Sequence, residues 1–301
     1  MVQHASVDPS DTDGSAPPSL RDVVAVLDAA YPPGTAQSWD QVGLVSGDLD
    51  QPVRRIHAAV DPTLDVIAEA RDAGADLLLT HHPLLLRGVH SVATSTAKGA
   101  SITALVVADL ALYVAHTNAD VATPGVNTAL AAVCGLTDDL TPLVVEEDQA
   151  LGLVGELPSP VSLSTFATAL SDALPATAGG VRVAGPPKQT VSRVALLGGA
   201  GDGLLDAARA AGADVYVTSD LRHHPALEAR EEARVAGGTP CLVDVSHWAG
   251  ESLWLQEALD RLREALAAAG HDTDTVSTHV STVRTDPWTF TVGATPEGGT
   301  A

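Results

Sequence analysis

Short apolar runs alternate with Ala-rich helical segments along most of this chain, and that alternation limits the folds it can adopt. The apolar runs are rich in Val, Leu and Ile and are bounded by Gly, Pro or Asp, as strands usually are. Between them lie segments with the apolar spacing of amphipathic helices. Strands that alternate with helices are typical of proteins in which helices cover a largely parallel sheet. The sequence therefore predicts an α/β fold.

The alternation allows the expected elements to be placed by residue range. Ser19 precedes the first helix as an N-cap, and Pro32 and Pro33 end it. Prolines interrupt residues 141–190, where we expect a strand, a helix and a strand. The helices are expected at 20–30, 63–73, 98–108, 126–134, 163–174, 204–211 and 250–269, and the strands at 55–60, 76–79, 111–115, 191–197, 214–217 and 241–245.

One short sequence pattern occurs twice. Residues 70–76 read Ala-Arg-Asp-Ala-Gly-Ala-Asp, and residues 208–214 read Ala-Arg-Ala-Ala-Gly-Ala-Asp. In both copies a Thr follows four residues after the last Asp, at Thr80 and Thr218. Each copy predicts a helix, a glycine that ends it, and a buried strand whose exit could open onto a site. An internal duplication explains the pattern, and so does a helix-to-strand turn that is common in Ala-rich proteins.

The repeated pattern favours a two-lobed organisation. We expect an N-terminal α/β lobe at 19–140, which residues 274–292 could complete, a second α/β lobe at 141–273, and disordered tails at 1–18 and 293–301. The tails are expected to be disordered because small and polar residues dominate them and cannot bury enough apolar surface.

The charge and the cysteine content exclude several classes of protein. A formal net charge of −22 argues against nucleic acid and anionic membranes as partners. Cys134 and Cys241 lack CxxC spacing and are typical of a reduced, intracellular chain. The sequence shows neither a charged-then-apolar leader nor an apolar run near the ~20 residues of a membrane helix. It therefore predicts a soluble, cytoplasmic protein.

Two adjacent histidines follow one of the predicted strands. His81 and His82 come after the apolar run at 77–80 and before Pro83. Neighbouring side chains on a strand point to opposite faces, so this pair is poorly placed to chelate one ion. At a strand end that turns before a proline, the two imidazoles can instead serve two ions side by side. Two exposed loop histidines are the alternative interpretation.

A carboxylate and a further histidine follow the next strand. His116 and Asp120 lie just past the strand predicted at 111–115. Ligands of α/β folds bind at the carboxyl ends of parallel strands, where a carboxylate can bridge or terminate a metal pair. His116 is suited to orient Asp120 or a bound water. A core histidine satisfied by backbone groups is an equally consistent interpretation of His116.

His247 and Glu251 are four residues apart, where the strand predicted at 241–245 passes into a helix. Positions i and i+4 lie on one face of a helix, and a histidine and a carboxylate placed so can bind a metal ion. If the helix begins just after His247, the two side chains are less strictly aligned on one face but can still approach the same metal ion. A glutamate near a helix start is also stabilised by the helix dipole, so a capping role is the alternative.

All five candidate ligands fall at predicted strand exits: His81, His82, Asp120, His247 and Glu251. Five ligands do not saturate two ions, so positions for water stay open. Two divalent ions bound by two carboxylates would leave an excess of about two positive charges at the site. That excess favours a bound hydroxide and an anionic ligand, although the chain as a whole is acidic. Imidazole and carboxylate ligands suit Zn, Fe, Mn and Co alike. The sequence therefore predicts two divalent metal ions per subunit and leaves their identity open.

Four segments occur in an order that resembles the signature of a known family. They are Ser38-Trp39-Asp40-Gln41-Val42-Gly43-Leu44, Thr80-His81-His82-Pro83, His116-Thr117-Asn118-Ala119-Asp120 and His247-Trp248-Ala249-Gly250-Glu251. The set resembles that of the GTP cyclohydrolase I type 2 family, also called the NIF-three-like dinuclear-metal proteins, and the likeness extends from about Ser19 to Phe290. It implies that the five residues named above are the metal ligands. Trp39 and Asp40 are expected in a structural turn, with a place in the site as the alternative.

The resemblance also implies a fold, an assembly and an activity. The subunit would have a two-lobed NIF-three-like fold, with mixed sheets flanked by helices and the dinuclear metal site between the lobes. It would form a toroidal homohexamer whose metal sites face the interior. Residues 141–190 leave no room for the extra central domain of some members. The nominal reaction would be hydrolysis of a small anionic, nucleotide-like substrate, in which a metal-bound hydroxide opens the guanine ring of GTP and releases formate.

Three histidines are candidates for proton transfer in such a reaction: His116, His223 and His224. His223 and His224 could equally begin a solvated helix. They follow Thr218-Ser219-Asp220, where the family often has Gly in place of Ser219. Because Gly tolerates a strained backbone or a close ligand, Ser219 leaves the shape of the pocket open.

Two further alternatives concern the ligand. Residues 197–203 are Gly-rich but lack the Lys and Ser/Thr of a P-loop, so they predict a tight packing turn rather than a phosphate site. A metal-binding assembly that stores, delivers or senses ions would use the same five ligands and catalyse nothing. A substrate pocket with convergent polar groups beside the metals is what would distinguish a hydrolase from such an assembly.

Overall fold

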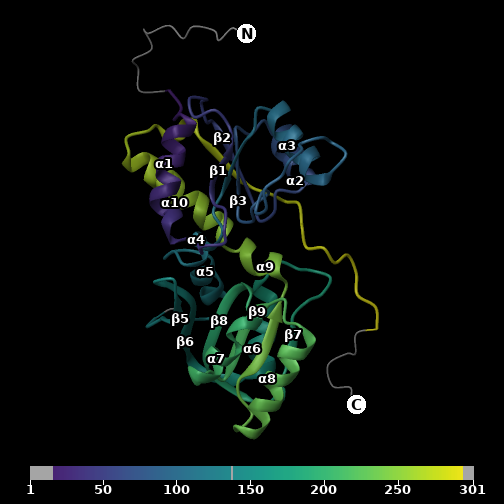
Figure 1. Ribbon diagram of the computed structural model, residues 1–301. Coiled ribbons are helices and arrows are strands. Elements are labelled where there is room, and N and C mark those ends of the chain that lie inside the picture. The colour runs from purple at the N-terminus through teal and green to yellow at the C-terminus, as the bar shows by residue number, and fades with distance from the viewer. Residues whose placement is uncertain (1–15, 137, 294–301) are drawn as a thin grey trace.

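The computed structural model of the protein describes residues 16–136 and 138–293. Its strands form two sheets, stacked end to end along the long axis of the molecule, and helices flank both (Figure 1). The tails predicted at 1–18 and 293–301 lie almost wholly outside the described residues. Across the described ranges, no helix is both long enough and apolar enough to span a membrane.

The first sheet has five strands, in the order β1-β4-β3-β2-β11. Their bounds are Gly43–Ser46 for β1, Arg55–Ala59 for β2, Leu77–Thr80 for β3, Ala111–Val114 for β4 and Ser277–Val280 for β11. All neighbours are parallel except β1, which is antiparallel to β4. The helices α1 (Leu20–Ala30) and α10 (Trp254–Ala268) cover one face, and α2 (Leu64–Asp72) and α3 (Ala97–Val107) cover the other.

The second sheet has six strands, in the order β5-β6-β8-β9-β10-β7. Their bounds are Thr141–Glu146, Gln149–Ser162, Thr190–Ala200, Val215–Ser219, Cys241–Val245 and Arg182–Ala184, in that order. The three central strands β8, β9 and β10 are parallel, and the outer neighbours pair antiparallel. The helices α5 (Val126–Val133) and α6 (Leu163–Ala173) pack on one face, and α7 (Leu205–Ala210) and α8 (His223–Val235) on the other.

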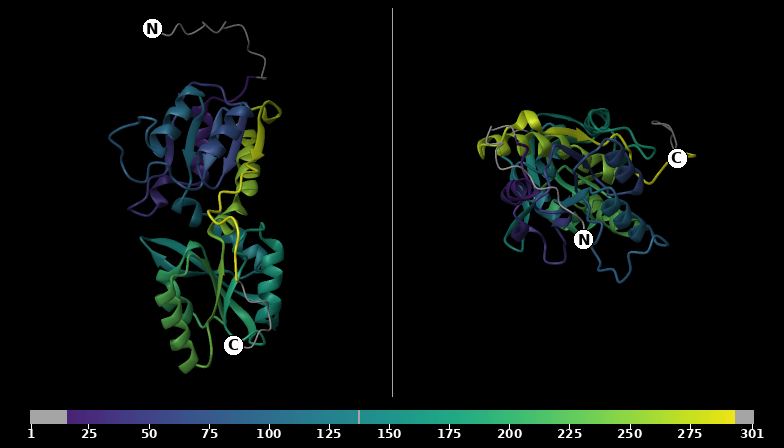
Figure 2. Two further views of the ribbon diagram at one scale, coloured as in Figure 1. Left: turned by 90° about the vertical axis from the view of Figure 1, so that its right-hand side faces the viewer. Right: turned by 90° about the horizontal axis from the view of Figure 1, so that it is seen from above.

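Two short helices lie where the sheets meet, α4 (Thr117–Asp120) and α9 (His247–Ser252). In Figure 1 they sit between the two sheets, and the side view in Figure 2 shows the same stacking. The chain leaves β10 of the second sheet, passes through α9, and enters α10, which packs on the first sheet. Three single-turn helices complete the structure, at Pro33–Thr35, Asp202–Leu204 and Thr273–Thr275.

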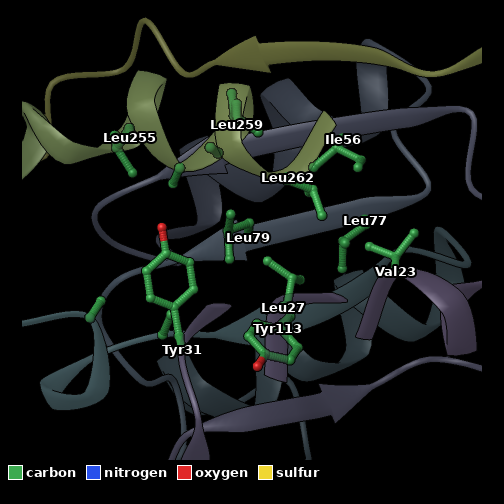
Figure 3. Packing of buried hydrophobic residues seen from close by; sticks show 14 of the residues in the cluster. Val23, Leu27, Tyr31, Ile56, Leu77, Leu79, Tyr113, Leu255, Leu259 and Leu262 are labelled. Carbon is green, nitrogen blue, oxygen red and sulfur yellow. The ribbon is translucent and has the colours of Figure 1, made fainter. Parts of the chain in front are cut away.

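The contact of α10 with the first sheet shows how the apolar pattern builds the core. Leu255, Leu259 and Leu262 recur at helical spacing and are buried against the sheet, beside Ile56 and Leu79 (Figure 3). Burying one such side chain contributes about 1.5–3 kcal/mol relative to leaving it exposed. This packing fixes the end of α10 that follows α9, and with it the position of the α9 side chains between the sheets.

The predicted α/β class is confirmed, with two mixed sheets flanked by helices. The Ser19 cap is also confirmed, since its Oγ accepts the Asp22 N–H while the Asp22 carboxylate accepts the Ser19 N–H. Residues 274–292 contribute β11 to the five-stranded sheet. The separation into two lobes stays a prediction.

Two predicted elements were wrong. The helix expected at 250–269 is two helices, interrupted at Leu253, which keeps helical dihedral angles (φ −59°, ψ −31°), so the hydrogen-bonding pattern breaks without unwinding. The single strand expected after residue 141 is a hairpin of β5 and β6. Its turn places Glu147 and Asp148 at positive φ (48° and 63°), a geometry usually signalled by Asn-Gly or Asp-Gly.

Candidate metal centre

The structure brings the five predicted ligands together at the meeting point of the two sheets. His81 and His82 follow β3, Asp120 ends α4 after β4, and His247 and Glu251 lie in α9 after β10. All five therefore follow the carboxyl ends of parallel strands, where α/β folds place their ligands.

The Glu251 carboxylate lies at the centre of the cluster. Its Oε1 is 3.4 Å from His81 Nε2 and 2.8 Å from His247 Nε2, while its Oε2 is 3.0 Å from His82 Nε2. Asp120 Oδ1 approaches the same His81 nitrogen at 3.6 Å. The spacing of four residues in α9 gives the His247–Glu251 contact directly, as the sequence predicted. Glu251 is 2% exposed and contacts three imidazoles, so it is not a helix cap.

Each histidine of the cluster is oriented through its other ring nitrogen. Nδ1 of His81 lies 2.9 Å from the carbonyl oxygen of Ala115. Nδ1 of His82 lies 2.7 Å from Asp61 Oδ1, and Nδ1 of His247 lies 2.8 Å from Asp220 Oδ2. These acceptors require a proton on Nδ1, which leaves each Nε2 directed at the cluster. Histidines that bind metals are fixed in this way by a carboxylate or a backbone carbonyl.

Several buried polar atoms of the cluster have no hydrogen-bond partner. They are His81 Nε2, Asp120 Oδ1 and Glu251 Oε2. Such an atom costs free energy unless something satisfies it, and more so when the group is charged. A divalent cation among these nitrogen and oxygen atoms would satisfy all three, so the residues present fit a metal centre. The ligand atoms of His82, His247 and Glu251 lie within 4.8 Å of one another, close enough for one ion.

The cluster also changes the proton affinity of its members. Burial lowers the pKa of His82 and of His247, but the charges and hydrogen bonds of the surrounding carboxylates outweigh it and raise each pKa to about 10. Burial raises the pKa of Asp120 to about 6. A cation that binds here must displace protons from the imidazoles, so its binding is coupled to proton release.

Trp39 lies in a turn at residues 38–39, as expected, and both Trp39 and Asp40 also contact His116 beside the cluster, in line with the alternative. Asp40 Oδ1 lies 2.8 Å from His116 Nδ1, and its Oδ2 accepts hydrogen bonds from Thr117 N and Oγ1 at 3.0 and 2.6 Å. Burial would raise the pKa of the Asp40 carboxyl, but these hydrogen bonds outweigh it and hold the pKa at about 2. The Trp39 ring packs edge-on against the His116 ring, with centroids 5.8 Å apart.

His116 faces the cluster with its free nitrogen. A ring nitrogen of His116 lies within 4.8 Å of those of His81 and His82. Since His116 Nδ1–H donates its hydrogen bond to Asp40, Nε2 is the atom available at the cluster. His116 therefore forms a carboxylate–imidazole pair beside the metal ligands.

The Gly-rich segment is a close packing turn beside the ligands. Gly199 has φ +75°, and a Cβ there would lie 3.0 Å from Glu251 Oε1. A side chain at this position would meet both a strained backbone and the central carboxylate of the cluster. This explains the glycine without a bound phosphate, in agreement with the sequence.

Ser219 is buried, and its hydroxyl has no hydrogen-bond partner in the described chain. The strained position is its neighbour Asp220, with φ +58°. The backbone at this strand exit is therefore left-handed at the residue that orients His247, and Ser219 does not need the freedom of glycine.

His223 and His224 lie apart from the cluster. Both are exposed at the start of α8, and their rings contact each other with centroids 5.1 Å apart. His223 borders a groove with β7 and α8, while neither residue lines the two cavities next to the metal ligands.

Asp61 and Asp220 are site residues that the sequence prediction missed. Both carboxylates bind the Nδ1 of a candidate ligand, as described above. Asp61 closely follows β2 and Asp220 directly follows β9. Both could therefore have been predicted in the same way as the histidines, from their place just past the carboxyl end of a parallel strand.

Two cavities open beside the cluster. The larger, of about 760 Å³, is bordered by His82 and His247 together with the segment that follows β11. The smaller, of about 420 Å³, is bordered by Trp39, His116 and Glu251 together with the Gly-rich turn. Both fall in or near the size range of small-molecule sites.

A family model described as Duf34/NIF3 (NGG1p interacting factor 3) matches residues 18–287. The chain belongs to the Duf34/NIF3 family. Among the relatives of this Duf34/NIF3 protein is a Streptomyces coelicolor protein, 46% identical over 284 residues, with 93% of this chain and 96% of the relative covered. A Mycobacterium leprae protein is 38% identical over 377 aligned positions, with 89% and 94% covered. Both are named GTP cyclohydrolase 1 type 2 homolog.

Solved structures of the family have the same fold. A Bacillus cereus protein related to NIF3 superposes with a TM-score of 0.82 at 25% identity, over 92% of this chain and 100% of the other. The alignment with the M. leprae protein spans 377 positions, more than the 301 residues of this chain. That relative therefore contains residues that this chain lacks, which agrees with a compact form of the family.

Proposed function

We propose that this Duf34/NIF3 protein is a dinuclear-metal-dependent hydrolase that acts on a nucleotide-like substrate. The observation that carries the proposal is the buried Glu251 carboxylate, which contacts three Nε2 atoms on rings whose Nδ1 atoms are already fixed. His82 and His247 offer ligand atoms close enough to Glu251 for one ion, and Asp120 approaches His81 on the other side, so the carboxylate is suited to be shared by a pair of ions.

Each ion would have its own protein ligands. His81 and Asp120 would hold one ion, His82 and His247 the other, and Glu251 would be shared. The ligand set does not choose among Zn, Fe, Mn and Co. Two divalent ions bound there would supply an activated water near neutral pH and stabilise negative charge that develops on the substrate.

The chain would supply proton transfer and a route of access for the substrate. His116 Nε2 is the atom placed to take a proton from the attacking water or to donate one to the leaving nitrogen, because Asp40 fixes the ring tautomer. The cavities on either side of the ligands give a substrate direct access to them. A non-catalytic store or carrier of metal ions, the alternative, has no use for such cavities, so they support the hydrolase.

The nominal reaction follows from the names of the relatives. GTP would be opened at its imidazole ring, with release of formate. A phosphoester would use the same pair of ions, so the products must be measured separately.

The experiment is turnover of GTP by the protein reconstituted with Zn, Mn or Fe, with formate and phosphate quantified separately. The blank is the double variant Asp120→Ala, His247→Ala, which removes one ligand from each ion. Formate that only the intact site releases supports ring-opening hydrolysis, and phosphate alone redirects the substrate to phosphoesters. Two bound metals per chain with neither product would contradict the hydrolase and favour the storage role.

Self-association belongs to the proposal. The family likeness implies a toroidal homohexamer with metal sites on its inner surface, so the sedimentation mass is expected at six times the 30.6 kDa of the chain. A monomeric mass at micromolar concentration would contradict it.

A further inference from the structure

The aromatic residues of the chain are distributed unevenly. The sequence contains four Trp, three Tyr and two Phe. Five of these rings are buried in the cores: Tyr31, Tyr113, Phe166, Tyr216 and Trp254. Every other aromatic ring borders one of the two cavities beside the metal ligands: Trp39, Trp248, Trp288 and Phe290. Trp248 also packs against both cores, whereas Trp39, Trp288 and Phe290 are exposed, so core packing does not explain the position of these three rings beside the cavities.

Three of these rings border the larger cavity. Trp248 comes from α9, directly after the candidate ligand His247, while Trp288 and Phe290 come from the segment that follows β11. Trp288 is 69% exposed and Phe290 77% exposed, so both stand at the mouth of the cavity. Exposed apolar rings at a cavity mouth mark a surface that gains free energy when a ligand or another protein covers it.

The segment that carries Trp288 and Phe290 is held in place across both sheets. Thr285 Oγ1 donates to Asp61, the residue that orients His82. Ser246 Oγ donates to Asp286 Oδ2 at 2.5 Å, and Thr291 Oγ1 donates to the carbonyl oxygen of Ala178 at 2.6 Å.

In Figures 1 and 2 this segment, coloured yellow, descends from the first sheet along the second. These bonds fix the two rings at the cavity instead of leaving them on a free terminus.

The charges around the cavity select among flat ligands. Its border contains four carboxylates, Asp61, Asp220, Asp244 and Asp286, and one guanidinium, Arg182. Arg182 is already paired with Asp244. Asp61, Asp220 and Asp286 also have partners, since they accept hydrogen bonds from Thr285, His247 and Ser246. Each carboxylate keeps further lone pairs, so the border offers acceptors to a ring that presents N–H donors and disfavours an anionic ring.

From this arrangement we infer that the larger cavity binds the ring of the substrate, and that the ring is an uncharged, flat nitrogen heterocycle with N–H donors, of purine or pteridine type. Trp288 and Phe290 stack on it, and Trp248 lines the wall toward the ligands His82 and His247. Stacking on aromatic side chains suits any such ring, since every base has a π-face. The inference rests on the proposed hydrolase, because it assigns the substrate class of the same site.

The experiment is calorimetric binding of 7-deazaguanosine to the metal-loaded protein. This nucleoside keeps the flat ring and its N–H donors, but a carbon replaces N7 of guanine. Its C8 is therefore not susceptible to hydrolysis, and binding is measured without turnover. Ribose serves as the ring-free control and orotate as an anionic flat ring. We expect 7-deazaguanosine to bind at least tenfold more tightly than either.

The decisive variants are Trp288→Ala and Phe290→Ala, alone and combined. Each ring is exposed, so its removal leaves the cores intact, and each is expected to weaken 7-deazaguanosine binding about tenfold. Val235→Ala, at an equally exposed apolar residue at the end of α8, is the matched control and should change nothing. Unchanged binding in the double variant would overturn the inference, and so would a changed sedimentation mass with unchanged binding, which would make the rings a subunit contact.

The test separates this inference from the proposed hydrolase. If the protein hydrolyses nothing but still binds 7-deazaguanosine through Trp288 and Phe290, the proposed hydrolase is contradicted and the ring-binding site is supported. Metal-dependent hydrolysis at an unchanged rate in both Trp288→Ala and Phe290→Ala would support the proposed hydrolase and contradict the ring-binding site.

Discussion

The exits of β3 and β9 share a scaffold and differ in what they supply to the site. Before each strand, the carboxylate of an aspartate accepts two backbone N–H groups of the neighbouring strand. Asp76 accepts those of residues 54 and 55, and Asp214 accepts those of residues 192 and 193. An arginine of the neighbouring strand also donates to a carbonyl oxygen at the end of the helix that leads into each exit strand. Arg55 donates to Ala73 after α2, and Arg193 donates to Ala211 after α7.

After the strands the two exits diverge. Thr80 is followed by two candidate ligands, His81 and His82, whereas Thr218 is followed by Ser219 and Asp220. The second exit supplies an orienting carboxylate to His247 and no ligand of its own. Local backbone chemistry therefore builds the same frame twice, and the two side chains at its end decide whether the exit offers candidate metal ligands.

The largest expected effect comes from the residue that joins the two sides. Glu251→Gln keeps the shape of the side chain but removes the charge that three imidazoles face. We expect metal content to fall from about two ions per chain to below one, measured by elemental analysis after desalting. Glu228→Gln, at an exposed acid of α8, is the control. Full metal content in Glu251→Gln would refute a shared ligand.

The equivalence of the two frames is tested by Asp76→Ala and Asp214→Ala. Each substitution leaves two backbone N–H groups without their charged acceptor. We expect each to lower the free energy of unfolding by about 2–3 kcal/mol, measured by urea denaturation, with no such loss for the exposed Asp72→Ala. A large effect at only one position would show that the frames are alike in geometry alone.

The orienting carboxylates give the next comparison. Asp61→Asn acts on His82 and Asp220→Asn acts on His247, each through Nδ1. Both are expected to weaken metal affinity about tenfold without unfolding the chain, measured by competition with a chromogenic chelator. Asp65→Asn, on the exposed side of α2, should leave affinity unchanged. Equal affinity in all three variants would mean that ring orientation does not limit metal binding.

Asp40 tests the carboxylate–imidazole pair through pH. Its folded pKa of about 2 lies below the ordinary value of 3.8, so its contribution to stability is present above about pH 4 and is lost as pH falls through about 2. Asp40→Asn removes that contribution. The wild type should exceed the variant by about 2 kcal/mol in free energy of unfolding near pH 5, and the gap should shrink toward pH 2. A gap that is constant with pH would mean that the carboxylate charge is not the cause.

The smallest effect is expected at Ser219, the buried residue before the left-handed Asp220. Ser219→Gly removes a buried hydroxyl without a partner and adds backbone freedom to the unfolded chain, so the two terms oppose each other. We expect a change below about 1 kcal/mol in stability and unchanged metal affinity. A loss of affinity would place the hydroxyl in the site.

The sequence predicted the features that depend on local chemistry. His81, His82 and Asp120 were predictable because each follows a recognisable buried strand, and strand exits meet at one edge of a parallel sheet. His247 and Glu251 were predictable from helical spacing.

Other features depend on distant contacts and left little trace in the sequence. Residues 274–292 were expected to complete the first lobe, but the strand β11 within them was not expected, because three of its four residues are polar and its partner β2 lies more than two hundred residues away. The position of Trp288 and Phe290 depends on hydrogen bonds to residues from both sheets. The role of Asp40 rests on Thr117, 77 residues further along the chain.

The contact between His82 and His247 joins positions 165 residues apart, with 3.2 Å between their Nε2 atoms. In polymer terms, an ion held by both would be a reversible crosslink that closes a long loop. Closing such a loop restricts the unfolded chain far more than it restricts the folded one, and binding only to the folded form adds to that difference. Binding the ions would then strengthen the contact between the two sheets, which Trp248 already makes by packing against both cores, so chelators would lower the stability of that contact as well as empty the site.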